Sequence, residues 1–152
     1  IGNKNFLMAY AHIGHDCIVG NEVIMVNYCA LSGHVQVDDF ATIGAYAAVH
    51  QFCQVGAYAF IARATYVTKD VLPYVMIAGH ETTACGLNAV GLRRRGFSSD
   101  AITNLKRAYK IIFRKGLTVA QALSELEGMC SDTPEIAKMM HALEHATRGI
   151  VR

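Results

Sequence analysis

Four histidines in the first third of the chain are the residues best suited to acid–base or metal chemistry: His12, His15, His34 and His50. An imidazole can take a proton from an attacking hydroxyl group. Two residues next to these histidines in the sequence could take part. The carboxylate of Asp16, after His15, can orient an imidazole, and the backbone N–H of Gly33, before His34, can stabilise an oxyanion. These are the parts that acyl transfer needs, provided that the fold brings them together.

A period of six residues indicates how the fold would do so. Every sixth residue from Ile1 to Val67 is aliphatic or Met. The following position is often Gly, and the fifth column holds mostly small side chains: Ala11, Cys17, Cys29, Ala41, Ala47, Cys53, Ala59 and Thr65. Neither an α-helix nor a regular strand has this period. The pattern is typical of short strands and tight turns stacked into a solenoid with a narrow apolar interior.

The period resembles that of the hexapeptide-repeat proteins, which implies a left-handed helix with three units in each coil. Residues 18 apart would then stack at about the inter-strand spacing of 4.8 Å. Under this rule His15 shares a column with Gly33 and Gln51, and His34 shares one with Asp16, so we expect the four histidines on one edge. Spacing alone leaves two interpretations open, namely a catalytic group or histidines that pack at an interface between subunits.

The second half of the chain has a helical pattern. Thr118 and Gln121 have the spacing of a capping box, and Thr133-Pro134 marks a further helix start. We predict helices at about 98–115, 118–130 and 134–147, covering the open end of the solenoid. Their expected apolar stripes are Ile102, Leu105, Tyr109 and Ile112 in the first, and Ile136, Met139, Met140 and Leu143 in the last.

The predicted fold class is therefore mainly β with an α C-terminal region. We expect a left-handed parallel β-helix at 1–72, a connector with a short helix at 73–97 and a helical domain at 98–152. The opening residues already follow the repeat and lack an initiator Met, so we expect the chain to be the C-terminal part of a longer protein.

Composition favours a cytoplasmic protein. The five cysteines form no C-x-x-C pair and follow no signal segment. Residues 40–62 lack Asp, Glu, Lys and Arg, but their polar residues and fixed period argue against a transmembrane segment. From Arg93 to Lys115 there are eight basic residues and one acid, a charge that would attract a diphosphate or an acidic protein. Without interleaved aromatic residues or a known motif, we expect no nucleic-acid binding.

Five segments together resemble one known family, the UDP-N-acetylglucosamine O-acyltransferases of lipid A biosynthesis. The resemblance covers essentially the whole chain, and the segments occur in the family's order and spacing: 11–17 (AHIGHDC), 31–35 (LSGHV), 37–40 (VDDF), 48–53 (AVHQFC) and 91–97 (GLRRRGF). It implies transfer of an (R)-3-hydroxyacyl group from acyl carrier protein to the glucosamine 3-hydroxyl of UDP-N-acetylglucosamine. It also implies a homotrimer with sites between subunits. No cofactor or metal is expected, apart from the 4'-phosphopantetheine that the carrier brings.

Matching positions imply the roles of individual residues. His15 corresponds to the general base, followed by Asp16, and Gly33 to the oxyanion-binding amide. Seven further residues match family positions that bind or orient the substrates: His12, His34, His50, Gln51, Asn88, Arg94 and Arg95. Of these, Gln51 and Asn88 match nucleotide-sugar contacts, and the two arginines match residues near the phosphates or the carrier.

The chain also departs from the family pattern. Val90 stands where relatives place a Glu near the nucleotide sugar, and His80 and Ala84 depart from the usual local pattern. Arg63 stands where some relatives keep a small residue at the end of the acyl groove, and it would shorten the accepted acyl chain if it pointed inward.

Three other functions stay open on sequence grounds. The sister N-acyltransferase shares the solenoid and the donor, but the Arg-rich segment and the His-Gln-Phe element disfavour it. A trimeric β-helix carbonic anhydrase would use clustered histidines to hold zinc, but it gives Gly33 no role. A non-catalytic scaffold would tolerate the loss of His15.

Overall fold

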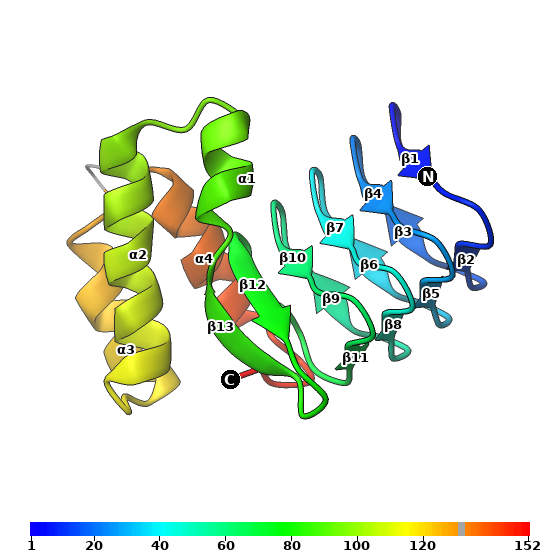
Figure 1. Cartoon of the computed structure of the whole chain (residues 1–152). Helices are drawn as coiled ribbons and strands as arrows, with labels where there is room; N and C mark the ends of the chain where they lie inside the picture. The colour runs from blue at the N-terminus through cyan, green and yellow to red at the C-terminus, as the bar shows by residue number, and fades with distance from the viewer. Residues whose placement is uncertain (131–132) are drawn as a thin grey trace.

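The computed structural model describes residues 1–130 and 133–152, so the predicted helical domain at 98–152 includes two residues, 131 and 132, outside the described part. A parallel β-helix occupies the N-terminal half, and the four helices found among the described residues lie at its C-terminal end (Figure 1). The β-helix is left-handed, as the resemblance to the hexapeptide-repeat proteins implied. None of the described helices has the length and apolar character needed to cross a membrane.

Eleven two-residue strands build the regular coils in the described part of the chain. Partners stand 18 residues apart, as in the pairing of Phe6 with Ile24, which confirms three units per coil. The strands are β1 Phe6–Leu7, β2 His12–Ile13, β3 Ile18–Val19, β4 Ile24–Met25, β5 Ala30–Leu31, β6 Gln36–Val37, β7 Thr42–Ile43, β8 Ala48–Val49, β9 Gln54–Val55, β10 Phe60–Ile61 and β11 Tyr66–Val67.

The coils form a prism with three faces. The first face contains β1, β4, β7 and β10 and continues into β12 (Val75–Ala78) and β13 (Thr83–Leu87). The second face contains β2, β5, β8 and β11, and the third contains β3, β6 and β9. The antiparallel hairpin of β12 and β13 was not predicted, because residues 73–97 follow no six-residue period.

The predicted interior column is buried from Val19 to Val67. Ile1 and Leu7 belong to the same column but are 73% and 43% exposed. Leu7 stands in register with buried Met25, and the exposure arises at the first coil, where β1, β2 and β3 each pair with a neighbouring strand on one side only. Two inward columns fill the prism, since the small fifth column is also buried from Cys29 to Thr65.

The left-handed turn conformation lies on residues to which the sequence analysis assigned no role in the turns. The second residue of each corner turn has a positive φ although none is Gly, including Asp16 (φ 58°) and His34 (φ 61°). The glycines after the apolar column serve close stacking, since an added Cβ on Gly44 would lie 2.6 Å from the carbonyl oxygen of Ile61. These glycines therefore hold the coils close and do not form the turns.

The helices are α1 Ala89–Arg94, α2 Ser99–Arg114, α3 Val119–Glu127 and α4 Glu135–Glu144. The predicted capping box of Thr118 and Gln121 is present, and the stripe of α2 is buried. The hydroxyl of Tyr109 on α2 donates a hydrogen bond to the carbonyl of Ala84 on β13 (2.7 Å), so α2 is fastened to the hairpin. Each predicted long helix ends one to three residues earlier than expected, because turns and caps take the end positions.

Candidate functional site

One corner of the prism collects the predicted acid–base residues. It joins the second and third faces, and its successive turns contain His15 with Asp16, Gly33 with His34, and Gln51 with Phe52. The predicted vertical order of position 15, position 33 and position 51 is therefore present. We call this group the histidine corner.

The histidine corner is held by direct contacts. Nδ1 of His15 lies 2.8 Å from a carboxylate oxygen of Asp16, and Nε2 of His34 lies 3.8 Å from the same oxygen. The hydrogen bond from His15, followed by the charge of His34, lowers the pKa of the Asp16 carboxyl. Asp16 therefore stays ionised and can hold the His15 proton on Nδ1, which leaves Nε2 as the acceptor.

Nε2 of His15 lies directly against Gly33. A Cβ built on Gly33 would stand 2.5 Å from Nε2 and 2.6 Å from Cε1 of this imidazole. Gly33 is the one glycine among the equivalent first turn positions, which also include Ala9, Asn27 and Ala45. A side chain therefore fits this position of the coil in general, and its absence at residue 33 makes room for the imidazole.

Gly14 lets its coil approach the backbone of the next coil closely at this corner, and the sequence analysis did not assign it a role in the site. A Cβ on Gly14 would lie 2.9 Å from the backbone nitrogen of Gly33. Within the part of the chain that the structure describes, the N–H of Gly33 has no hydrogen-bond acceptor. The His-Ile-Gly-His spacing contains the signal, but only the stacking reveals which amide Gly14 faces.

The four histidines do not all meet on one edge as predicted. His15 and His34 touch, with ring centroids 5.0 Å apart and rings nearly perpendicular. His12 lies on β2 in the second face, and His50 directly precedes its corner turn, where its Nδ1 lies 3.1 Å from the carbonyl of Gln51. The reason is that positions 12 and 50 belong to a strand and to its end, whereas 15 and 34 belong to turns.

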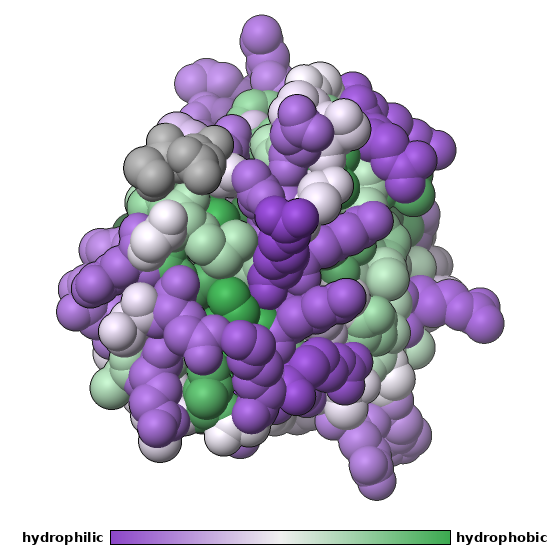
Figure 2. Space-filling view, turned by 90° about the vertical axis from the view of Figure 1, so that its left-hand side faces the viewer, coloured by the Kyte–Doolittle hydropathy of each residue, from purple (hydrophilic) through white to green (hydrophobic). Residues whose placement is uncertain are grey.

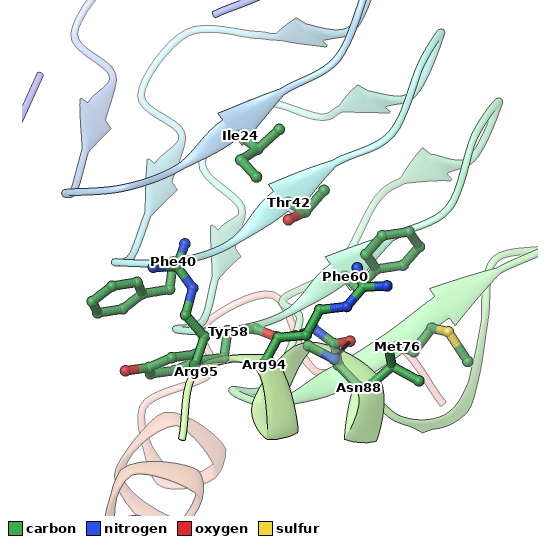
Figure 3. Close-up of a pocket in the computed structure, with 11 residues that line it drawn as sticks. Ile24, Phe40, Thr42, Tyr58, Phe60, Met76, Asn88, Arg94 and Arg95 are labelled. Atoms are coloured by element: carbon green, nitrogen blue, oxygen red, sulfur yellow. Dashed lines mark hydrogen bonds between the residues drawn. The ribbon is translucent and has the colours of Figure 1, made fainter. Parts of the chain in front are cut away.

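Asn88, Arg94 and Arg95 lie elsewhere, around a pocket of about 550 Å³ on the first face. The floor of this pocket, the arginine pocket, consists of outward side chains of successive coils, including Thr42, Phe60 and Met76 (Figure 3). The predicted contact residues stand on and beside α1, which lies next to the floor.

Asn88 positions α1. Its side-chain oxygen accepts a hydrogen bond from the backbone N–H of Gly91 (3.1 Å) and caps the helix. Its amide nitrogen donates to the carbonyl of Tyr58 on the β-helix (3.0 Å). This double contact fastens the helix that carries the arginines to the coil beneath it.

The two neighbouring arginines point to different ends of the pocket (Figure 3). The guanidinium of Arg95 lies 2.5 Å from a carboxylate oxygen of Glu22 and 4.7 Å from the ring centre of Phe40. Arg94 extends over the other end, toward Phe60. Arg95 is therefore held by the β-helix, and the sequence could not reveal this pair because 73 residues separate its members.

The departures from the family pattern occupy three places. Val90 is 55% exposed and lines the arginine pocket. Arg63 is exposed in the turn after β10. His80 is exposed in the loop between β12 and β13, whereas Ala84 is buried beneath α2.

The basic residues of 93–115 are exposed along α1 and α2. Figure 2 views the end of the molecule formed by the helices, where hydrophilic side chains cover much of the surface and leave smaller hydrophobic areas. Lys115 is paired with Glu125 on α3 (2.5 Å). The remaining exposed basic side chains of α2 are Lys106, Arg107, Lys110 and Arg114.

The two groups lie on opposite sides of one chain. In a three-faced prism, the corner between the second and third faces is opposite the first face, where the arginine pocket lies. The fold and the two groups define the class of this molecule: a left-handed β-helix protein with a helical C-terminal region, a histidine–aspartate pair at one corner and a basic pocket on the far face.

Comparison with known proteins identifies the family. The family model "Udp N-acetylglucosamine O-acyltransferase; Domain 2" matches residues 70–151. A curated relative from Pseudomonas syringae pv. tomato, an acyl-[acyl-carrier-protein]–UDP-N-acetylglucosamine O-acyltransferase, is 49% identical over all 152 residues, which span 59% of its length.

Two solved structures agree with this assignment. The UDP-N-acetylglucosamine acyltransferase of Francisella novicida superposes with a TM-score of 0.96 at 41% identity, covering 100% of this chain and 56% of that one. The UDP-N-acetylglucosamine O-acyltransferase of Moraxella catarrhalis gives 0.97 at 39% identity, covering 100% and 59%. The chain belongs to the UDP-N-acetylglucosamine O-acyltransferase family.

Proposed function

We propose that the protein carrying this chain catalyses the first step of lipid A synthesis. It would move an (R)-3-hydroxyacyl group from acyl carrier protein to the glucosamine 3-hydroxyl of UDP-N-acetylglucosamine. The observation that carries the proposal is the contact of His15 Nε2 with the bare backbone of Gly33. Family membership supports the choice of substrates, because the Pseudomonas syringae relative is named for the same donor and acceptor.

His15 acts as the general base in this proposal. Nδ1–H of His15 donates a hydrogen bond to the Asp16 carboxylate, so the lone pair of Nε2 is free to accept the proton of the 3-hydroxyl group. The hydroxyl oxygen then attacks the thioester carbonyl, and the C–S bond breaks. The proton on Nε2 returns to the departing thiolate. His12, His34 and His50 bind or orient the substrates beside this base.

Gly33 stabilises the negative charge that develops on the carbonyl oxygen. Its N–H has no acceptor among the described residues, and it lies beside the base because Gly33 and His15 occupy one column. Removal of one such donor costs other enzymes about 10²–10³ in kcat. Gly14 contributes indirectly, because it lets the coil that carries His15 lie close to this nitrogen.

The second half of the site comes from a neighbouring copy of the chain. The histidine corner and the arginine pocket face opposite directions within one chain, so one substrate can contact both only across a subunit boundary. A homotrimer provides such boundaries. In this assembly Gln51 and Asn88 contact the nucleotide sugar, with Arg94 and Arg95 near the phosphates or the carrier.

The donor needs no resident cofactor, because the carrier brings the acyl group on its own 4'-phosphopantetheine. The exposed basic side chains of α2 favour an acidic partner such as this carrier. The five free cysteines are consistent with a reducing compartment, and we place the protein in the cytoplasm.

A transfer assay tests the proposal. Substitution His15→Ala should abolish product formation from hydroxyacyl-carrier and UDP-N-acetylglucosamine. The product is detected by mass spectrometry. The circular dichroism spectrum should not change, because 75% of the side chain is exposed on the single chain, and we expect the trimer to persist. His141→Ala, which removes an exposed histidine of α4, is the matched control. Transfer by the His15 variant at the rate of the control would overturn the proposal.

The same assay separates the other candidate functions. UDP-3-O-acylglucosamine is offered as a second acceptor, and acylation of its 2-amine in preference to the 3-hydroxyl would indicate the N-acyltransferase. A zinc-dependent carbonic anhydrase would hydrate carbon dioxide and lose this activity with a chelator. The proposed acyltransferase keeps its full activity after treatment with a chelator.

A further inference from the structure

Three side chains of the histidine corner form a set of metal-ligand atoms. One ring nitrogen of His15, one of His34 and a carboxylate oxygen of Asp16 all lie within 4.8 Å of one another, and the nitrogens measured to the Asp16 oxygen are Nδ1 of His15 and Nε2 of His34. All three residues are exposed, with side-chain exposures of 75%, 66% and 43%. A cation can therefore reach them from solvent without a change in the core.

The backbone holds this set in place. Asp16 and His34 occupy equivalent turn positions of successive coils and share the same left-handed conformation. The N–H of His34 donates to the carbonyl of His15 (3.0 Å), which fixes the offset between the two turns. The His34 ring stacks on Phe52 of the next coil, with centroids 4.7 Å apart and planes within 8°. Three coils thus support the set.

The spacing matches a tetrahedral metal ion. Zinc binds imidazole nitrogen and carboxylate oxygen at about 2.0–2.2 Å, which places neighbouring tetrahedral ligand atoms about 3.3 Å apart. The distances from the shared Asp16 oxygen are 2.8 Å to His15 and 3.8 Å to His34. Each of these two distances needs a shift of about half an ångström. The two imidazole nitrogens lie within 4.8 Å of each other and have to approach by up to about 1.5 Å, which exposed side chains make by rotation. Imidazole and carboxylate ligands suit zinc, whereas magnesium and calcium prefer oxygen alone.

We propose that His15, Asp16 and His34 bind one Zn²⁺ ion per chain and that this ion inhibits the protein. A neutral imidazole carries one ring proton. When zinc takes Nδ1 of His15, that proton moves to Nε2, and the lone pair that would accept a hydroxyl proton is lost. The ion also takes the Asp16 oxygen that orients the ring. The inhibition rests on the proposed role of His15 as base, whereas the binding does not.

A second pair of histidines has to be removed before binding is measured. His141 and His145 lie one turn apart on and beside α4, with ring centroids 4.1 Å apart, and two imidazoles at this spacing can also hold a metal ion. The double substitution His141→Ala/His145→Ala therefore provides the background protein. His141 and His145 lie over the third face, where they line a pocket with Ile18 and Gln36. The substitution leaves the histidine corner intact, because the contacts that hold His15, Asp16 and His34 involve neither residue.

Binding is measured by titration calorimetry with zinc chloride. The background protein should bind one ion per chain, and adding His34→Ala should weaken the affinity at least about tenfold, since even second-shell changes cost 10- to 100-fold. Co²⁺ serves as a spectroscopic probe, and the visible absorption of its tetrahedral complex should disappear with the same change. Equal affinities with and without His34, in proteins with the same circular dichroism spectrum, would overturn the site.

Inhibition is measured separately on the unmodified protein. The rate of acyl transfer should fall as zinc occupies the site and should recover when a chelator is added. Magnesium at the same concentration should leave the rate unchanged. Zinc bound at the corner without loss of transfer would overturn the inhibitory part of the proposal and the assignment of His15 as base. A protein with no transfer activity at all would overturn the proposed function and leave the binding result unaffected.

Discussion

Substitution Gly33→Ala tests the stacking of base and amide most directly. The added methyl group would stand 2.5 Å from Nε2 of His15, a distance that real Cβ contacts do not reach. The imidazole has to move, since the backbone at residue 33 is fixed by the coil. It can do so at little cost, because 75% of its side chain faces solvent.

The expected effect on stability is therefore small and the effect on activity large. Gly33 does not have a positive φ, so Ala brings no backbone strain. Ala also lowers the conformational entropy of the unfolded chain, which by itself adds about 0.4–1 kcal/mol to the free energy of unfolding. We expect the melting temperature to stay within about 3 °C of the parent. Displacement of the base should lower kcat/KM by about 10²–10⁴, the contribution of a positioned general base, or about 2.7–5.4 kcal/mol in transition-state stabilisation.

Gly44→Ala is the matched control. Its added Cβ would meet backbone atoms, at 2.6 Å from the carbonyl oxygen of Ile61 and 2.7 Å from the nitrogen of Arg63. Backbone cannot rotate away, so this variant should lose about 1–3 kcal/mol of stability and keep its activity per folded molecule. The assay combines urea unfolding with initial rates of acyl transfer. A folded Gly33→Ala protein with more than about a third of the parent kcat/KM would refute the reasoning.

Three further predictions concern the arginine pocket and the core. Asn88→Ala removes a helix cap and a tether and should cost about 1–2 kcal/mol in urea unfolding; Asn88→Asp, which retains the cap acceptor, should cost less. The ion pair of Glu22 and Arg95 should make the melting temperature depend on salt concentration, and Glu22→Gln should remove this dependence. The free energy of unfolding should fall by about 0.5 kcal/mol or less. Burial raises the pKa of the Cys29 thiol to about 11, so at pH 8 it stays protonated. In the folded protein a thiol reagent should therefore modify exposed Cys85 and spare Cys29, and equal labelling rates would contradict the packing.

Much of the β-helix could be predicted because its rule is local and repeated. One apolar residue in six determines which side faces inward, and the 18-residue coil then places His15 beside Gly33 without further information. The helices of the second half were predictable for the same reason, since the stripe of Ile102 and Leu105 and the cap at Thr118 are local signals.

Contacts between distant segments could not be predicted in this way. The hairpin of β12 and β13 lies outside the period, and no local pattern shows that Asn88 binds the carbonyl of Tyr58 or that Arg95 pairs with Glu22. Such contacts depend on the angle at which α1 meets the coils. That angle results from packing between residues far apart in the chain.

The sequence by itself determined the repeat, the inward column and the identity of the residues capable of acid–base chemistry. Only the tertiary structure decided how these residues are distributed. It separated His12 and His50 from the corner, showed that Gly14 borders the Gly33 nitrogen, and placed the arginine pocket opposite the histidines. The physical reason is that a six-residue period assigns each side chain a height and a face, whereas contact also depends on the turn conformation and on the packing of elements that share no period.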